Sequence, residues 1–236
     1  MKIRMIGTGS MISSDNPASY LIDNKIMIDM PNGIVKALKK QSLFENVEYV
    51  FITHLHGDHI FDLPFLFLDR LKTNKSLFVV LDKRWFKTIK KLVKLAFPRQ
   101  YYNIFYCSNI KFVFTNINIV DNLKITRIEV EHGNMKPSYG YSIIEKDTKV
   151  FITGDSCLND TLLQTIEKHN LLICDCTNAI GNNKHMGVDN IEFLLTCFPK
   201  LKIIPSHMGI TAKEKLKKIT NKNLIIKEDM EEFDYE

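Results

Sequence analysis

Residues 49–59 read YVFITHLHGDH, and the interpretation of the whole chain starts from this stretch. Its first five residues are mostly apolar and are all aromatic or β-branched, which predicts a short buried strand. The next six hold three imidazoles and one carboxylate. Imidazoles gathered this closely repel one another once protonated, whereas together with a carboxylate they suit a metal ion. His54 and His56 can reach one ion from the strand end, while Asp58 and His59 start a helix and point elsewhere, so we predict two metals.

Three further candidate ligands each follow a predicted strand. His132 comes after TRIEVE, Asp155 after KVFITG and His207 after KIIPS. Because α/β folds tend to place their sites at the carboxyl ends of strands, we expect these side chains to join the first four. Five His and two Asp then form a site of nitrogen and oxygen ligands without a thiolate.

Composition sets the limits within which this site has to be built. The chain has 236 residues, of which 45% are hydrophobic and 25% charged, and this excludes a disordered or low-complexity protein. We see no linker or repeat and predict one domain over residues 1–236. Five Cys do not make a disulfide framework, and no apolar run approaches the roughly 20 residues of a membrane span. We therefore expect a cytoplasmic protein with no membrane contact.

The apolar pattern predicts an α/β domain built from two mixed halves, with sheets between helices. The hairpin within it turns at Asp23-Asn24, and Asp82 is expected to cap a helix. Strands are predicted over residues 3–6, 19–22, 25–29, 49–53, 76–81, 111–115, 124–131, 138–145, 149–153, 171–175, 201–205 and 223–226. Helices are predicted over residues 33–41, 58–71, 82–96, 161–168, 188–198 and 212–219.

Charge is unevenly distributed, although the net value is only +5. The stretch from Arg70 to Arg99 holds ten Lys or Arg and one acid. It is interpreted either as the solvated face of an amphipathic helix or as a phosphate-binding surface. Residues 228–236 hold six acids, which predicts a solubilising end.

The HxHxDH box, the later strand-end His, the Gly-Asp pair and the final strand-end His resemble the metallo-β-lactamase superfamily. The chain is most similar to its branch of ribonuclease Z and small phosphodiesterases. That similarity extends to GTGSMISSDNPASYLIDNKIMIDMPNG at residues 7–33, to VFITHLHGDHIFDLPFLF at 50–67, and to PSYGYSI at 137–143. The resemblance implies a four-layer αββα sandwich and a metal-dependent hydrolase, with phosphodiesters as the favoured substrates.

The resemblance also implies a role for each candidate residue. His54, His56 and His132 would hold one metal, Asp58, His59 and His207 the second, and Asp155 would bridge them. Zn²⁺ is the default ion for such ligands, with Mn²⁺ or Fe²⁺ as alternatives. Two ions can share a bridging hydroxide, because they lower the pKa of water toward ~7. Asp58 would then accept a proton, and His185, in KHMG, would act as general acid near the leaving group.

Two departures from ribonuclease Z weaken the case for tRNA processing. Only 23 residues separate Asp155 from His132, which leaves no room for the long arm of that enzyme. The segment after His207 reads MGITAK and lacks its Arg- and Tyr-bearing tail. We therefore expect the substrate to be a small anionic phosphodiester or a nucleic-acid end.

Several alternatives stay open at this stage. The chain could be an acyl hydrolase, such as a thioesterase, lactonase or β-lactamase-like enzyme, or the tRNA 3′-endonuclease itself. A flavodiiron-type oxidoreductase is disfavoured, because such sites usually have Glu where His56 stands. A metal-stabilised scaffold without turnover is the remaining class. The apolar segment after His59 suggests a homodimer, and His169 is expected at the surface by a helix end.

Overall fold

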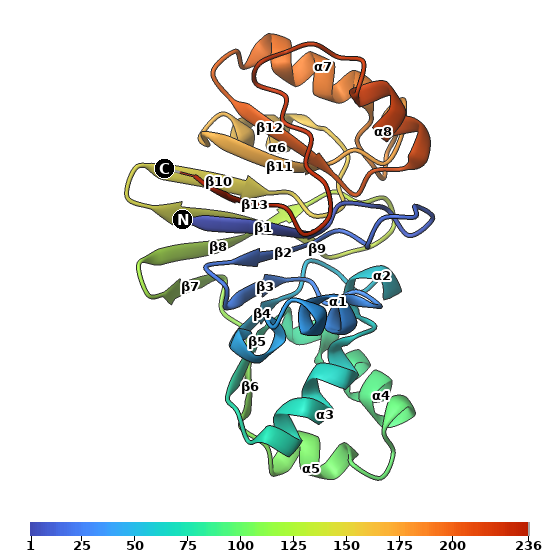
Figure 1. The fold of residues 1–236 in the computed structure, drawn as a ribbon, viewed down its shortest axis with the longest axis vertical. Helices are drawn as coiled ribbons and strands as arrows, with labels where there is room; N and C mark the ends of the chain where they lie inside the picture. The colour runs from blue at the N-terminus through green and yellow to red at the C-terminus, as the bar shows by residue number, and fades with distance from the viewer. Residues whose placement is uncertain (236) are drawn as a thin grey trace.

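The computed structural model describes residues 1–235, in which two β-sheets lie face to face between two layers of helices (Figure 1). One sheet has the order β13-β1-β2-β3-β4-β5-β6. Its strands are β1 (Lys2–Gly7), β2 (Ser19–Ile22), β3 (Ile26–Ile28), β4 (Tyr49–Phe51), β5 (Leu77–Val80), β6 (Ile110–Val113) and β13 (Glu232–Asp234). The other sheet has the order β12-β11-β10-β9-β8-β7. Its strands are β7 (Ile117–Val120), β8 (Leu123–Val130), β9 (Ser138–Glu145), β10 (Thr148–Ile152), β11 (Leu171–Asp175) and β12 (Lys202–Ser206).

The helices divide between the outer faces of the two sheets. The seven-stranded sheet is covered by α1 (Ile34–Lys40), α3 (Leu63–Thr73), α4 (Phe86–Ala96) and α5 (Tyr101–Tyr106). The six-stranded sheet is covered by α6 (Asp160–Ile166), α7 (Val188–Cys197) and α8 (Ile210–Leu216). The short helix α2 (Gly57–Ile60) and the 3₁₀ turns Phe44–Asn46 and Lys83–Trp85 complete the set.

Three separate apolar cores hold these four layers together. The central core lies between the sheets, and each outer core lies between one sheet and its helices. Successive side chains of a strand point to opposite faces of its sheet, so one strand contributes to the central core and to an outer core. On β12, Ile204 packs between the sheets, while Ile203 packs in the core with α7 and α8. This architecture confirms the α/β sandwich with the layer order αββα.

Several local predictions are confirmed by the backbone. Asp23 and Asn24 adopt the left-handed conformation, with φ of 47° and 59°, in the hairpin between β2 and β3. The Asp82 carboxylate accepts the Arg84 N–H at 2.8 Å, as an N-cap does. The helical segment expected over residues 58–71, with a kink or restart at Pro64, is divided into α2 and α3, because Pro64 lies in the first turn of α3, where a missing N–H costs nothing.

The C-terminal prediction is wrong. Residues 223–226 make only an isolated bridge, Leu224 to Ile203, and the final strand instead forms within the acidic tail. β13 pairs antiparallel with β1, and Glu232 accepts a hydrogen bond from Arg4 at 2.5 Å. The tail is therefore part of the sheet, because backbone pairing and an opposite charge on the neighbouring strand offset its acidity.

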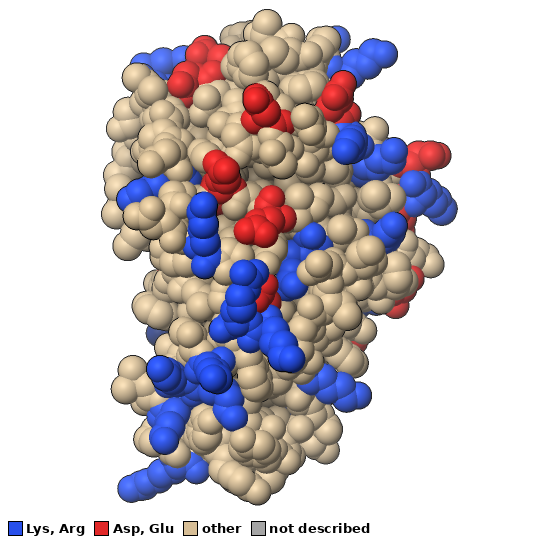
Figure 2. Space-filling model, turned by 180° about the vertical axis from the view of Figure 1, so that it is seen from behind, with Lys and Arg blue, Asp and Glu red and all other residues tan. Residues whose placement is uncertain are grey.

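The basic stretch is mostly a solvated surface. Along α4, Ile89 and Val93 are buried, whereas Lys87, Lys91 and Lys94 are exposed. Figure 2 shows Lys and Arg gathered over the lower half of one face, where Figure 1 places α3, α4 and α5. Arg70 is the exception: it is wholly buried and donates to the carbonyl oxygens of two residues, Phe44 and Val47. Within residues 1–235, no helix is both long and apolar enough to cross a membrane.

Candidate metal centre

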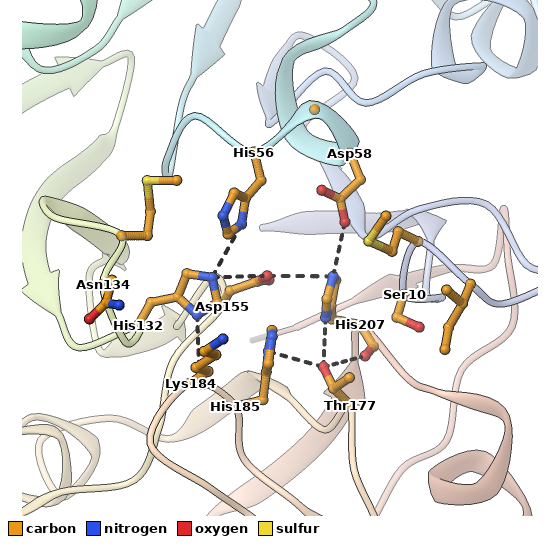
Figure 3. A pocket seen from close by; sticks show the side chains of 14 residues that line it. Ser10, His56, Asp58, His132, Asn134, Asp155, Thr177, Lys184, His185 and His207 are labelled. Atoms are coloured by element: carbon orange, nitrogen blue, oxygen red, sulfur yellow. Dashed lines mark hydrogen bonds and ion pairs between the residues drawn. The ribbon is translucent and has the colours of Figure 1, made fainter.

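Three imidazoles converge where β4 and β8 end. His54 and His56 lie on the loop from β4 to α2, and His132 follows β8 (Figure 3). His56 Nδ1 is 2.9 Å from His54 Nε2 and 3.2 Å from His132 Nε2. Three nitrogens directed at one point form a group that could hold a single metal ion.

A second group lies beside the first. Asp58 and His59 come from the first turn of α2, and His207 follows β12 in the left-handed conformation, with φ of 51°. Asp58 Oδ2 is 3.5 Å from His207 Nε2 and 3.9 Å from His59 Nε2. These three side chains could hold a second ion.

Asp155 lies between the two groups. It follows β10 and is only 3% exposed. Its Oδ2 is 3.8 Å from His54 Nε2 and 3.5 Å from His207 Nε2, and its Oδ1 is 3.4 Å from His59 Nε2. The structure therefore brings all seven predicted ligands together, with this carboxylate facing both sets.

Hydrogen bonds from the ring nitrogens that face away from the centre fix the protonation of His54, His59 and His132. His59 Nδ1 donates to Asp29 Oδ2 at 2.7 Å, and His132 Nδ1 donates to the Lys184 carbonyl at 2.8 Å. Thr53 Oγ1 donates to Asp29 at 2.7 Å, so it accepts from His54 Nδ1 at 3.0 Å. Since Nδ1 carries the proton in each ring, Nε2 is left with a lone pair directed at the centre.

A similar set of hydrogen bonds from an Asp and a Thr holds His207 and His185. Thr177 Oγ1 donates to Asp175 Oδ1 at 2.7 Å and accepts from His207 Nδ1 at 2.7 Å. The other oxygen of Asp175 accepts from His185 Nδ1 at 2.7 Å. His185 thus joins the centre through Asp175, with its Nε2 left free. His185 also forms a possible ligand group with Asp155 and His207.

The residues present fit divalent metal ions. His59 Nε2 is buried and has no hydrogen-bond partner among the described residues, which is costly unless a cation binds it. All ligand atoms are imidazole nitrogens or carboxylate oxygens, a donor set suited to Zn²⁺, Mn²⁺ or Fe²⁺. We therefore regard the cluster as a metal centre whose ion remains to be identified.

Electrostatics differ between the two groups. Burial lowers the pKa of His54, His56 and His132, so these rings stay neutral and ready to coordinate. Burial also acts to lower the pKa of His59 and His207, but the neighbouring carboxylates, Asp155 foremost, together outweigh burial and raise both pKa values. Without an ion, this second group is the one that holds protons.

The pKa of His185 is raised in a similar way. Burial acts to lower its pKa, but the hydrogen bond to Asp175 and the charges of Asp175 and Asp155 together outweigh burial, and the pKa rises. The ring is half-buried and lines the cavity above the ligands (Figure 3). His169 lies apart from the centre, and its Nδ1 donates to the Thr165 carbonyl at the end of α6, as expected. The ring is half-buried rather than at the surface, with its Nε2 2.7 Å from Ser142 Oγ.

The ligands form the floor of a cavity of about 600 Å³. Apolar and polar side chains make up its walls, and among the described residues the acids that line it are Asp58 and Asp155. The other lining residues are Ser10, Met11, Ile12, His56, Gly57, His132, Asn134, Met135, Thr177, Lys184, His185 and His207. A volume of this size suits a small molecule.

Sequence reasoning missed the residues that orient the ligands. Asp29 and Thr53 fix His54 and His59, and Asp175 with Thr177 fixes His207 and His185. The sequence offered only their positions as a signal: Asp29 directly follows β3, Asp175 ends β11 and Thr53 precedes the HxHxDH box at residues 54–59. Position alone does not reveal which imidazole each residue meets.

Comparison with known proteins places the chain among relatives. A family model described as anti-Pycsar protein Apyc1 matches residues 1–230. Ribonuclease Z from Geobacillus kaustophilus is 34% identical over 104 residues, covering 43% of this chain and 32% of that protein. Ribonuclease Z from Metallosphaera sedula is 30% identical over 155 residues, covering 63% and 50%. The chain thus matches about a third to a half of the length of these relatives.

Solved structures establish the fold. YhfI from Bacillus subtilis, a metallo-β-lactamase fold protein, gives a TM-score of 0.78 at 17% identity, with 98% of each chain covered. A diphosphatase of the PhnP family gives 0.75 at 15%, covering 100% of this chain and 98% of its own. The short form of human tRNase Z gives 0.74 at 18%, with 99% of each chain covered. The predicted metallo-β-lactamase fold is confirmed.

Proposed function

The chain belongs to the family described as anti-Pycsar protein Apyc1, and from this premise we propose that it is a two-metal phosphodiesterase acting on small phosphodiesters. The observation that carries the proposal is Asp155, a buried carboxylate within 4 Å of imidazoles from both ligand groups. When bound, two such ions lower the pKa of water and neutralise charge that develops on a phosphoryl group. We further propose an anti-Pycsar role, as the family description states.

Each residue then has a distinct task. His54, His56 and His132 would hold one ion, Asp58, His59 and His207 would hold the other, and Asp155 would serve both. Asp58 orients the attacking water and accepts its proton: burial acts to raise its pKa, but His207 and His59 outweigh this and lower it, so it is ionised. His185, protonated through Asp175, donates a proton to the leaving oxygen from Nε2.

The shape of the site favours a small substrate over a tRNA. The residues between His132 and Asp155 are taken up by β9, β10 and the turn joining them, so no protruding arm extends from this segment. Lys184 adds a positive charge at the wall, and no acid other than the proposed ligands faces the cavity. An anion with a compact organic group matches both features.

The experiment is a panel assay with metal analysis on the same sample. We expect about two ions of zinc, manganese or iron per chain and cleavage of bis-p-nitrophenyl phosphate. Both properties should be lost in His56→Ala and Asp155→Ala. Metal binding with thioester or lactone hydrolysis, but no diester cleavage, would identify an acyl hydrolase instead. Cleavage of a 3′-extended precursor tRNA at a rate that matches cleavage of the small diester would instead support a tRNA 3′-endonuclease.

The role of His185 can be separated from that of the metals. p-Nitrophenolate is a good leaving group that needs no acid, whereas the ribose oxygen of a dinucleoside phosphate does. His185→Asn should therefore lower kcat by about 10²-fold or more for the dinucleoside phosphate, and far less for the nitrophenyl ester. An equal loss on both substrates, with metal content unchanged, would contradict the acid role.

Two proposals concern partners. Phe61 and Phe65, on and beside the helices after the metal box, are each 52% exposed, which is consistent with a homodimer. Light scattering of the wild type and of a Phe61→Ser, Phe65→Ser double variant tests this, with a monomeric wild type as the contrary result. For the family role, Pycsar activity should fall in cells that express the wild type but not in cells that express His56→Ala.

A further inference from the structure

The loop from Ser10 to Asp15, called here the rim loop, forms one wall of the cavity. Ser10, Met11 and Ile12 line the cavity, and Figure 3 shows Ser10 on the opposite side of the ligands from Asn134. Met11 is 72% exposed and Ile12 is 73% exposed. Two adjacent large apolar side chains at the edge of a charged metal centre lose contact with water when an apolar ligand group covers them.

A single carboxylate holds both ends of the rim loop. Asp229 Oδ1 accepts from Thr8 N–H and from Thr8 Oγ1, each at 2.9 Å. Asp229 Oδ2 accepts from Asn16 N–H at 2.6 Å. Within the loop, Ser13 Oγ accepts from Asp15 N–H at 3.0 Å. The base of the loop is therefore fixed before any ligand arrives, which lowers the entropic cost of binding.

The rim loop is also joined to the metal centre. Met208, the residue after His207, donates its N–H to the Thr8 carbonyl at 2.8 Å and accepts from Ser10 N–H at 3.0 Å. The Ser10 hydroxyl is buried at the cavity wall and has no partner within the described residues. An unpaired buried hydroxyl is unfavourable, and an oxygen of a bound molecule would relieve it.

We propose that the rim loop determines substrate specificity by binding the organic group that stays on phosphorus during cleavage. Met11 and Ile12 contact a flat apolar ring in that group, and Ser10 donates to an oxygen of the phosphoryl ester. The leaving group lies toward His185, whereas the rim loop is bonded beside His207, so the two groups are recognised separately. This inference rests on the proposed phosphodiesterase function.

Two substrates that differ only in the retained group test the proposal. Bis-p-nitrophenyl phosphate keeps a ring after cleavage, whereas methyl p-nitrophenyl phosphate keeps a methyl group, and both lose the same leaving group. We expect Met11→Ser and Ile12→Ser each to raise KM for the first about tenfold, and for the second by less than about twofold. Ser10→Ala should raise KM for both, since both present phosphoryl oxygens.

The matched control is Ile119→Ser, which removes an isoleucine that is 67% exposed on the edge strand β7. It should leave both KM values unchanged, and metal content is measured for every variant. A ratio of the two KM values that stays constant in Met11→Ser and Ile12→Ser overturns the proposal. If the wild type cleaves neither diester, the phosphodiesterase proposal itself fails, and that result is distinct from cleavage with an unchanged ratio.

Discussion

Thr177 offers a direct test of how this protein holds metal, because its hydroxyl connects a ligand to a buried acid without touching the ion. The hydroxyl donates to Asp175 and accepts from His207 Nδ1, both at 2.7 Å. Thr177→Val keeps the shape of the side chain and removes both bonds. His207 then loses the acceptor that fixes its proton on Nδ1 and turns Nε2 toward the centre.

The expected loss of metal affinity in Thr177→Val can be worked out from the hydrogen-bond donor that the substitution leaves unpaired. His207 is buried, so its Nδ1 proton would face no acceptor, which costs about 1–3 kcal/mol. Loss of comparable outer-shell partners lowers metal affinity about 10- to 100-fold, or about 1.4–2.8 kcal/mol. The loss should fall on the ion of Asp58, His59 and His207, since His132 and His54 have other orienting partners.

Competitive Zn²⁺ titration against a chelator series, which resolves the two binding steps, measures this directly. Thr177→Val should weaken one step and leave the other within about threefold of the wild type. Thr177→Ser retains the hydroxyl and should bind both ions normally. Thr53→Val is the reciprocal variant, because Thr53 supports His54, and it should weaken the other step. Two unchanged steps in Thr177→Val, or an equal loss in Thr177→Ser, would refute the reasoning.

Three further predictions concern pH and packing. Zn²⁺ affinity should rise with pH across about pH 5 to 8, because neighbouring carboxylates together overcome burial and raise the pKa of His59 and His207, and their protons must leave before an ion binds; a flat series of binding isotherms would contradict this. Asp82→Asn should lower the free energy of unfolding by about 1–2 kcal/mol at pH 7, because Arg84 holds the pKa of Asp82 well below its usual range. A depressed carboxyl pKa stabilises the fold above the unfolded value near ~4 and ceases to do so as pH falls, so urea unfolding at pH 3 should show a smaller difference than at pH 7. Gly140→Ala should cost about 1–3 kcal/mol in thermal unfolding, because a Cβ there would lie 2.7 Å from the Ile152 carbonyl oxygen; an unchanged melting temperature would mean that the strands can part.

Elements with a strong local pattern were predictable from the sequence. The β2–β3 hairpin depends on Asp23 and Asn24, which tolerate positive φ. α4 depends on its apolar spacing, and Asp82 caps the 3₁₀ turn that leads into it. β13 was not predictable, because Glu232–Asp234 has no apolar alternation and forms a strand only where β1 offers a free edge and Arg4 a countercharge. Its pairing depends on a partner more than 220 residues away in the chain.

The proposed ligands could also be predicted from the sequence. Each is an imidazole or a carboxylate, and each lies within three residues after the end of a strand or at the start of α2. Their convergence was inferred from the order of strands and from family resemblance, and the structure brings them together. The orienting groups lacked such a signal, because an Asp or Thr at a strand end is common and its partner depends on the packing of both sheets.

The two halves of the centre in fact repeat one arrangement. In one half, Asp29 accepts from Thr53, which pairs with His54, and also accepts from His59. In the other, Asp175 accepts from Thr177, which pairs with His207, and also accepts from His185. By this correspondence His185 occupies the place of a ligand such as His59, yet His185 lines the cavity and is half-buried, whereas His59 is buried. Under our proposal, the same Asp–His pair that directs a lone pair at an ion in one half would hold a proton toward the substrate in the other.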